Sequence, residues 1–259
     1  MRTFCCVAIL TLYCVIAQAQ EWRDNAKIAA AFSGIPGGGT FVLYDVETGK
    51  FVGYNRERAT KRFVPASTFK IANSLIGLST GAIESVDEIL PFTGGPQAIK
   101  DWERNMSLRE AVAISNVPIY QELARRVGLE RMRDAVAGLN YGNADVGGSV
   151  DTFWLRGPLQ ISALEQCLFL ADLATGRLPL PQQAQKEVRD IILLKEKGEW
   201  ELYGKTGAAS GVGWWVGWVK QDSKVYAFAL NMDMVDYRRD GPLRVEIGRA
   251  CLQTLGLYR

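Results

Sequence analysis

The chain contains no histidine among its 259 residues. Histidine is the commonest base for activating a serine and a frequent zinc ligand. Its absence excludes a Ser-His-Asp triad and a histidine-rich zinc site, and we expect no metal. Any proton transfer near neutral pH must depend on carboxylates, lysines or tyrosines.

Long apolar runs are also missing, except at the N-terminus. There Arg2 precedes the apolar run "FCCVAILTLYCVIA", which ends before "AQA" at 17–19. A positive start, a short apolar run and an A-x-A site are typical of a signal peptide, so residues 1–19 are expected to be removed after Ala19. No later run is long enough to span a bilayer. We therefore expect export to the periplasm and no membrane anchor in residues 20–259.

Cysteine is scarce once the signal peptide is set aside. Three of the five cysteines lie in it, which leaves Cys167 and Cys251. Cys167 lies within the apolar helical pattern "ALEQCLFLADL". This placement favours a buried free thiol over a disulfide.

Charge of one sign is not concentrated anywhere. There are 30 basic and 28 acidic residues, for a net charge of +2, and no basic tract stands out. Nothing therefore favours nucleic acid as a partner. The glycine-rich "GIPGGGT" at 34–40 leads into a strand pattern and lacks a P-loop lysine, so no phosphate site is expected there.

Strand patterns occur at both ends of the chain. "TFVLYDVETGKFVGYN" at 40–55 predicts a hairpin, and "ELYGKTG", "GWWVGWVK" and "KVYAFALNMD" after residue 200 predict an antiparallel meander. Helices are expected at 21–34 and 242–256. Between the strands, residues 67–198 read as mostly helical, with capping boxes "SLRE" at 107–110 and "SALE" at 162–165. We predict one α/β (α+β) domain, with a central antiparallel sheet built from both chain ends and an inserted helical region.

"STFK" at 67–70 offers a nucleophile and a base. Residues three apart share a helix face, so the Lys70 amine can reach the Ser67 hydroxyl. A charged lysine cannot accept a proton, but burial lowers its pKa. The apolar residues that could surround it, if the fold brings them together, are Phe69, Val117, Trp154 and Leu155. Taken alone, S-x-x-K more often marks a capped helix start with a surface lysine.

Two further motifs strengthen this interpretation. "KTG" at 205–207 lies on a predicted strand, where a cation, a hydroxyl and a glycine can receive a ligand carboxylate. "SNV" at 115–117 lies between two helices, so Ser115 can project into a cleft. Each motif alone also fits an ordinary edge strand or a helix-linking turn. Together with S-x-x-K they approach the set shared by serine β-lactamases and penicillin-binding proteins, although S-N-V departs from S-D-N.

In this combination the chain resembles the class D β-lactamases, or oxacillinases. The motifs that carry the resemblance, in matching order and spacing, are "PASTFK" at 65–70, "SNV" at 115–117, "YGN" at 141–143, "FWL" at 153–155, "KTG" at 205–207, "WWVGWV" at 214–219 and "PLR" at 242–244. They cover nearly the whole mature chain. The resemblance implies the serine β-lactamase and penicillin-binding transpeptidase fold.

The resemblance also implies roles for single residues. Ser67 would be acylated by the β-lactam carbonyl. Lys70 would become N6-carboxylysine by reaction with carbon dioxide and act as general base in both half-reactions. Trp154 would donate its indole N–H to that group. The remaining roles implied are proton relay by Ser115, binding of the substrate carboxylate by Lys205, Thr206, Gly207 and Arg244, an oxyanion hole from the backbone N–H groups of Ser67 and Ala208, and an apolar lid of Val117 and Leu155.

The function implied is hydrolysis of small-molecule β-lactams in the periplasm, which gives β-lactam resistance. Carbon dioxide or bicarbonate would be needed to carboxylate Lys70, no other cofactor is expected, and the protein would be a monomer or homodimer. One alternative is a penicillin-binding transpeptidase or carboxypeptidase, which deacylates slowly from β-lactams. Another is a β-lactam sensor domain, which needs a membrane anchor. Many turnovers per site would distinguish a hydrolase from both alternatives.

Overall fold

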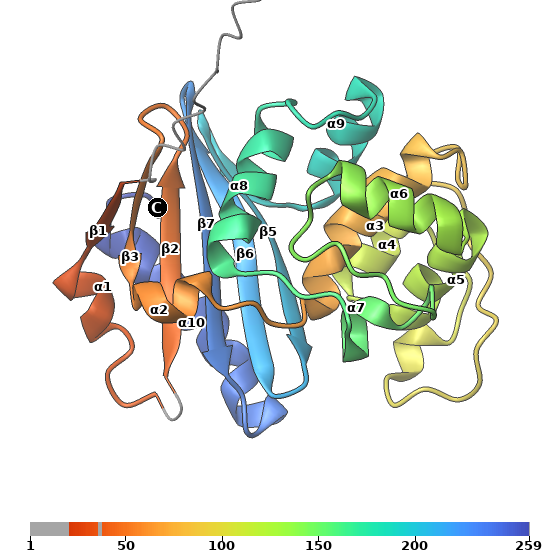
Figure 1. Ribbon diagram of the computed structural model, residues 1–259, viewed down its shortest axis with the longest axis horizontal. Coiled ribbons are helices and arrows are strands. Elements are labelled where there is room, and N and C mark those ends of the chain that lie inside the picture. Colours follow the sequence, from red (N-terminus) through yellow and green to blue (C-terminus); the bar gives the residue numbers. More distant parts are fainter. Residues whose placement is uncertain (1–20, 36–37, 259) are drawn as a thin grey trace, which may run out of the picture.

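The computed structural model describes residues 21–35 and 38–258 (Figure 1). The expected signal peptide at 1–19 lies outside the described residues. Seven strands form one sheet in the order β1-β3-β2-β7-β6-β5-β4. The strands are β1 (Trp22–Asp24), β2 (Gly39–Asp45), β3 (Lys50–Tyr54), β4 (Leu193–Lys197), β5 (Trp200–Ala209), β6 (Val212–Gln221) and β7 (Lys224–Asp233).

The prediction that both chain ends build one sheet is confirmed. β2 from the N-terminal hairpin pairs antiparallel with β7 from the C-terminal meander. The sheet is nevertheless mixed, because β1 pairs parallel with β3. The helix expected over 21–34 is correspondingly shorter. Its first residues extend along Phe51–Gly53, and α1 (Ala26–Ala30) begins only after Asn25, whose side chain caps it.

A second correction concerns the end of the predicted helical region. β4 falls inside the 67–198 segment and pairs antiparallel with β5. Its sequence, "LLKEK", gives a mostly exposed edge strand rich in charge. Charged side chains are a common protection for a strand edge, and this short pattern carries little strand signal of its own.

The two faces of the sheet bury different clusters of apolar side chains. Trp214, Val216 and Trp218 point into the larger cluster, whereas Trp215 and Val219 point into the smaller one, as the strand period of two requires. α8 (Ala163–Ala174) covers the first face, and α1 and α10 (Tyr237–Thr254) cover the other (Figure 1). Cys167 and Cys251 are both buried free thiols, and for Cys167 this is the form that was expected.

The helical region lies beside the sheet and completes the larger cluster. Its elements are the 3₁₀ turn η1 (Ala66–Phe69), α3 (Lys70–Ser79), the 3₁₀ turn η2 (Lys100–Trp102), α4 (Leu108–Ala113), α5 (Val117–Val127), α6 (Leu129–Gly138), α7 (Phe153–Arg156) and α9 (Gln182–Ile191). α2 (Arg56–Thr60) packs instead on β2 and α8 (Figure 1). Both predicted capping boxes are present, at Ser107 and Ser162.

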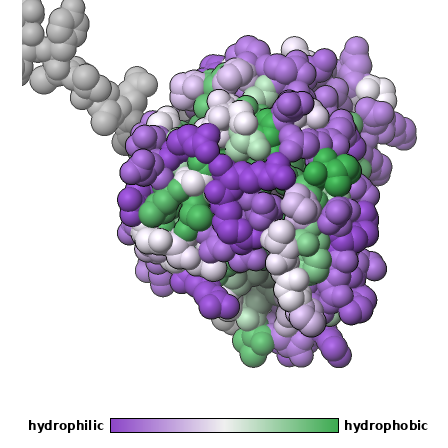
Figure 2. All heavy atoms as spheres, turned by 90° about the vertical axis from the view of Figure 1, so that its right-hand side faces the viewer, coloured by the Kyte–Doolittle hydropathy of each residue, from purple (hydrophilic) through white to green (hydrophobic). Residues whose placement is uncertain are grey.

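The surface of the helical region is mainly hydrophilic. On its outer side, apolar patches are separated from one another by polar side chains (Figure 2). Among the helices within residues 21–35 and 38–258, none has the length and apolar composition needed to cross a membrane.

Close packing of α10 on the sheet predicts that a side chain at Gly248 lowers stability. A Cβ there would lie 2.2 Å from a ring carbon of Trp215, so Gly248→Ala should force α10 outwards and lower the free energy of unfolding by about 1–3 kcal/mol. Gly138→Ala in α6 is the matched control, since a Cβ there meets no atom within 4 Å. It should leave stability equal or raise it by about 0.5–1 kcal/mol. Urea unfolding measures both, and equal stability of the two variants would contradict this packing.

Candidate active site

Ser67 and Lys70 meet where η1 passes into α3. The Ser67 Oγ and Lys70 Nζ atoms form a hydrogen bond of 2.8 Å, so the contact expected from the S-x-x-K spacing is present. Ser67 lies in the 3₁₀ turn and Lys70 is the first residue of the α-helix. The lysine side chain is 0% exposed, whereas Ser67 is partly exposed. The serine is therefore accessible from the surface, whereas the lysine side chain is enclosed.

The surroundings of Lys70 favour its uncharged form. Burial lowers the pKa of the amine well below its usual range, and the charge of Lys205 lowers it further. The Nζ atom lies 5.3 Å from the ring centroid of Tyr120, and the buried rings of Phe69 and Trp154 stack on each other with centroids 5.5 Å apart. A neutral amine can accept a proton or attack an electrophile, which a lysine in water at pH 7 rarely does.

Polar contacts fix the helix that carries Lys70. The Ser74 hydroxyl donates to the Lys70 carbonyl oxygen at 2.9 Å and shares a 2.9 Å hydrogen bond with the Tyr120 hydroxyl. The Asn73 side-chain amide donates to the Tyr120 carbonyl oxygen at 3.1 Å. α3 and α5 are thereby held together directly behind the amine. The sequence interpretation did not find Tyr120 or Ser74, although Ser74 lies one helical turn after Lys70.

Ser115 lies in the turn between α4 and α5 with a left-handed backbone, φ 56°. Residues other than glycine adopt this conformation only when their surroundings impose it. Asn116 does so: its backbone N–H donates to the Ala111 oxygen, its side-chain oxygen accepts from the Ile119 N–H, and its side-chain amide donates to the Trp102 oxygen. This role of Asn116 was missed, and its signal was an asparagine two residues before a helix-starting proline.

Lys205 connects this turn to strand β5. Its Nζ atom donates to Ser115 Oγ at 3.0 Å and to the Thr206 carbonyl oxygen at 2.9 Å. Burial lowers the pKa of Lys205 to about 7, and the charge of Arg244 contributes. The charged neighbours that shift Lys70 and Lys205 are thus cations themselves. A cluster of this kind favours the binding of an anion, because the anion relieves the mutual repulsion.

Arg244 reaches the same strand from α10. Its Nη1 atom donates to the Gly207 carbonyl oxygen at 3.0 Å, and burial lowers the pKa of the guanidinium. The Nε atom is buried and has no hydrogen-bond partner among the described residues. The guanidinium therefore retains a donor for a further acceptor.

Gly207 is required for a reason that the sequence analysis did not give. We expected the missing side chain to let a ligand approach the backbone, and a Cβ at Gly207 would also lie 3.0 Å from the Pro65 oxygen and 3.1 Å from the Thr68 nitrogen. The glycine therefore lets β5 pack against η1 and brings the neighbours of Ser67 close to the strand. Thr206 and Ala208 on either side are partly exposed, and Ala208 lines a surface hollow together with Met234 and Tyr237.

Trp154 is fully buried in α7, yet its indole N–H has no hydrogen-bond partner among the described residues. A buried donor left unpaired is unfavourable by about 1–3 kcal/mol. Its ring stacks on Phe69, the residue directly before Lys70. An unpaired buried donor therefore belongs to the ring that packs on the residue preceding Lys70.

Comparison with known proteins agrees with this geometry. Residues 39–253 match the family model of the penicillin binding protein transpeptidase domain. Beta-lactamase OXA-5 of Pseudomonas aeruginosa is 37% identical, over 99% of this chain and 98% of its own. Beta-lactamase OXA-48 of Klebsiella pneumoniae is also 37% identical, over 90% of this chain and 91% of its own. The chain belongs to the class D β-lactamases.

A solved structure supports the same assignment to class D. The class D β-lactamase FUS-1 (OXA-85) of Fusobacterium nucleatum subsp. polymorphum superposes with a TM-score of 0.87 at 40% identity, over 92% of this chain and all of that one. The fold and the enzyme class expected from the motifs are thereby confirmed.

In this class D β-lactamase, the predicted site residues converge from five separate parts of the chain. Hydrogen bonds join Ser67 to Lys70, Ser115 to Lys205, and Arg244 to the strand of Thr206, Gly207 and Ala208. Trp154 joins through its stacking on Phe69. Val117 and Leu155, the expected lid, are partly exposed rather than enclosed in the core.

The low pKa of Lys205 predicts a pH-dependent stability in buffer purged of carbon dioxide. The folded protein releases the Lys205 proton near pH 7, whereas the unfolded chain holds it to about pH 10. Stability should therefore rise with pH in this interval. Between pH 7 and 9, the free energy of unfolding of wild type should rise relative to that of Lys205→Met by at most about 1.4 kcal/mol for each pH unit. Urea unfolding of both proteins checks this, and parallel pH profiles would contradict it.

Proposed function

We propose that the protein hydrolyses β-lactam amides through an acyl-enzyme on Ser67. The observation that carries this is the Ser67–Lys70 hydrogen bond in a chain without histidine, with the lysine fully buried. Ser67 Oγ attacks the lactam carbonyl while its proton passes to Lys70. The C–N bond then breaks and the ring nitrogen receives a proton by way of Ser115. Water, activated by Lys70, releases the product acid and restores Ser67.

The substrate would be bound at two points, its carboxylate and its lactam carbonyl. The substrate carboxylate is bound by Lys205, by the Thr206 hydroxyl and by Arg244 beside Gly207. The backbone N–H groups of Ser67 and Ala208 stabilise the oxyanion that forms at the lactam carbonyl. The packing of Gly207 against η1 supports this pairing, because it brings the strand close to the turn that carries the serine.

Lys70 is proposed to act as N6-carboxylysine. Only a neutral amine reacts with carbon dioxide, and burial lowers the pKa of this one well below its usual range. The unpaired Trp154 N–H and the nearby charge of Lys205 suit the anion that results. Carboxylation would provide a carboxylate-like base for both half-reactions. Carbon dioxide or bicarbonate is therefore the only small molecule we propose besides substrate.

A penicillin-binding transpeptidase or carboxypeptidase, or a β-lactam sensor, could use the same serine and lysine. The hydrolase is favoured because the relatives named β-lactamases match over nearly the whole chain. We propose that the mature protein acts in the periplasm, as a monomer or homodimer, and confers β-lactam resistance. A small-molecule β-lactam is its substrate.

Removing the nucleophile tests this function. Ser67→Ala should abolish both turnover of a penicillin and the covalent adduct seen by mass spectrometry, with little change in stability, because the hydroxyl is partly exposed. Ser223→Ala, at an exposed serine in the β6–β7 turn, is the control and should turn over normally. A penicilloyl adduct on the Ser67→Ala protein would exclude Ser67 as nucleophile, and a single burst from wild type would favour the transpeptidase or sensor.

Carboxylation predicts a dependence on bicarbonate. Enzyme degassed at mildly acidic pH should lose activity and regain it with bicarbonate, while a carbamate resonance appears in carbon-13 NMR with labelled bicarbonate. Trp154→Phe retains the ring but removes the donor, which is worth about 1.5–3 kcal/mol to a charged acceptor, so half-saturation should need roughly 10–150 times more bicarbonate. Trp22→Phe is the control, because the Trp22 indole N–H donates to Asp24 at the surface. If no resonance appears and the rate ignores bicarbonate, Lys70 acts as a free amine.

A further inference from the structure

Helix α5 borders the segment that leads into Trp154. Val117, Gln121 and Arg125 follow one another at four-residue intervals, so they share one face of α5. On the other side, Asp151 lies three residues before Trp154. The two segments carry the two halves of the expected lid, Val117 and Leu155.

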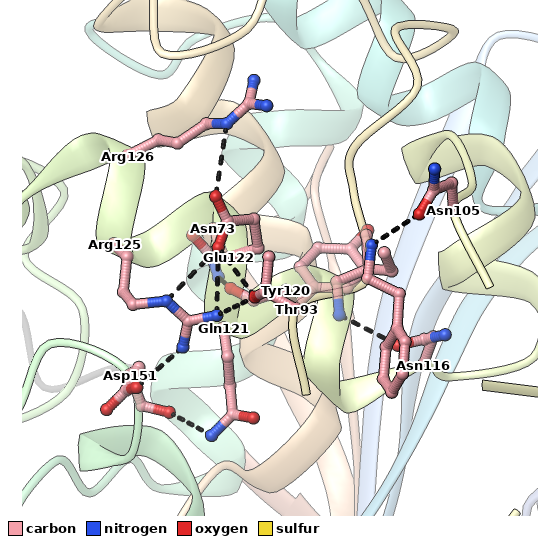
Figure 3. A network of polar contacts seen from close by, with 12 residues as sticks. Asn73, Thr93, Asn105, Asn116, Tyr120, Gln121, Glu122, Arg125, Arg126 and Asp151 are labelled. Atoms are coloured by element: carbon pink, nitrogen blue, oxygen red, sulfur yellow. Dashed lines mark hydrogen bonds and ion pairs between the residues drawn. The ribbon is translucent and has the colours of Figure 1, made fainter. Parts of the chain in front are cut away.

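Asp151 is bound from α5 at two points (Figure 3). The Gln121 side-chain amide donates to the Asp151 backbone oxygen at 3.0 Å, and Arg125 Nη1 donates to the Asp151 carboxylate at 2.9 Å. Both the backbone and the side chain of Asp151 are therefore fixed. We call Gln121, Arg125 and Asp151 the Asp151 clamp.

Arg125 is itself held in one orientation. Its Nη2 atom donates to Glu122 at 3.0 Å and to the Thr93 hydroxyl at 3.1 Å, and Nε donates to Glu122 at 3.3 Å (Figure 3). The adjacent Arg126 donates to Glu88 at 2.7 Å, and its Nε atom lies 3.6 Å from the other Glu122 oxygen (Figure 3). Two neighbouring arginines with similar exposure thus have different tasks, and only Arg125 contacts Asp151.

The position of Asp151 affects the position of α7, which begins two residues later. This helix has four residues, and Thr152 at its N-terminus makes no side-chain capping bond. So short a helix has little stability of its own and depends on its contacts. The Thr152 hydroxyl donates to Ser149 Oγ, and the N–H groups of Leu155 and Arg156 donate to the Thr152 oxygen at 2.9 and 3.1 Å. A shift at Asp151 would therefore move Trp154.

α5 also holds the lysine. Its Tyr120 accepts a hydrogen bond from Asn73 and binds Ser74 on the helix that begins with Lys70. One helix is thus the common support for the amine on one side and for the indole donor on the other. Because a hydrogen bond weakens steeply with distance and angle, the relative placement of these two groups decides its strength.

We propose that the Asp151 clamp is a positioning device that sets the Trp154 indole against Lys70 and so stabilises the carboxylated form of Lys70. This rests on the carboxylation proposed above. Its members act through Trp154 and touch neither substrate nor the reacting atoms. Arg125 and Asp151 are 40% and 29% exposed, so the ion pair contributes little to global stability. Its effect is therefore expected at the modified lysine rather than in unfolding.

The test compares clamp variants with a matched arginine control at one fixed, mildly acidic pH. The variants are Gln121→Leu, Arg125→Met, the combination of both, and Arg126→Met as control. Carbon-13 NMR with labelled bicarbonate gives the bicarbonate concentration that half-fills the carbamate, and initial rates give kcat at saturating bicarbonate. Each single clamp variant should raise the half-filling concentration about three- to fivefold and the combination about tenfold or more. Arg126→Met should match wild type, and Arg125→Lys should recover part of the loss.

A second comparison separates positioning from a general loss of order. In the Trp154→Phe background, the combined clamp variant should shift the half-filling concentration by less than about twofold, because the donor that it positions is gone. In otherwise wild-type protein, kcat at saturating bicarbonate should stay within about twofold.

Three outcomes would overturn the proposal. If wild type forms a carbamate and the clamp variants match Arg126→Met, the clamp has no such role. If the clamp variants lower kcat at saturating bicarbonate while the half-filling concentration is unchanged, the Asp151 clamp supports the fold only. If wild type forms no carbamate, the carboxylation proposed for Lys70 fails and the clamp proposal fails with it. Should the combined variant not fold, the single variants decide.

Discussion

The structure depends on keeping one lysine amine uncharged beside a serine. Without histidine, the protein must place Lys70 where water cannot stabilise its cation, and its side chain is accordingly fully buried, with the ring centroid of Tyr120 5.3 Å from the amine. Burial of this kind is unfavourable for the charged form only, so the same packing that stabilises the core selects the basic form of the amine. The unfolded chain keeps this proton at neutral pH, so the uncharged amine lowers the free energy of unfolding there, and the apolar packing around it has to offset that loss.

Local signals made most of the fold predictable. The hairpin of β2 and β3, the meander of β5 to β7 and the two capping boxes each depend on residues close together in sequence, and all are present. β1 and β4 were missed because they are short edge strands whose conformation depends on a partner distant in the chain. The antiparallel sheet therefore became a mixed one, and the helical region ended earlier than expected.

In the candidate site, too, local contacts were predictable from the sequence and contacts between distant elements were not. Helix spacing alone predicts that Lys70 reaches Ser67, and the contact is present. Placing Trp154 or Arg244 near them needed the resemblance, because no local pattern says which distant helix will close the site. The roles of Asn116 and Tyr120 were not predicted, since they arise from contacts with distant parts of the chain. Gly207 was singled out for ligand approach, and the structure adds a second reason for the missing side chain, which is the close packing of β5 against η1.

Arg244 lies on the terminal helix that also closes the smaller apolar core, through residues such as Ile247 and Cys251. The position of the Arg244 guanidinium at Gly207 therefore depends on how α10 packs on this core. An exchange of one apolar side chain for another in that core can shift the helix and with it the carboxylate-binding site proposed for Arg244. Adaptation to new antibiotics can thus begin at interior positions that no drug molecule ever meets.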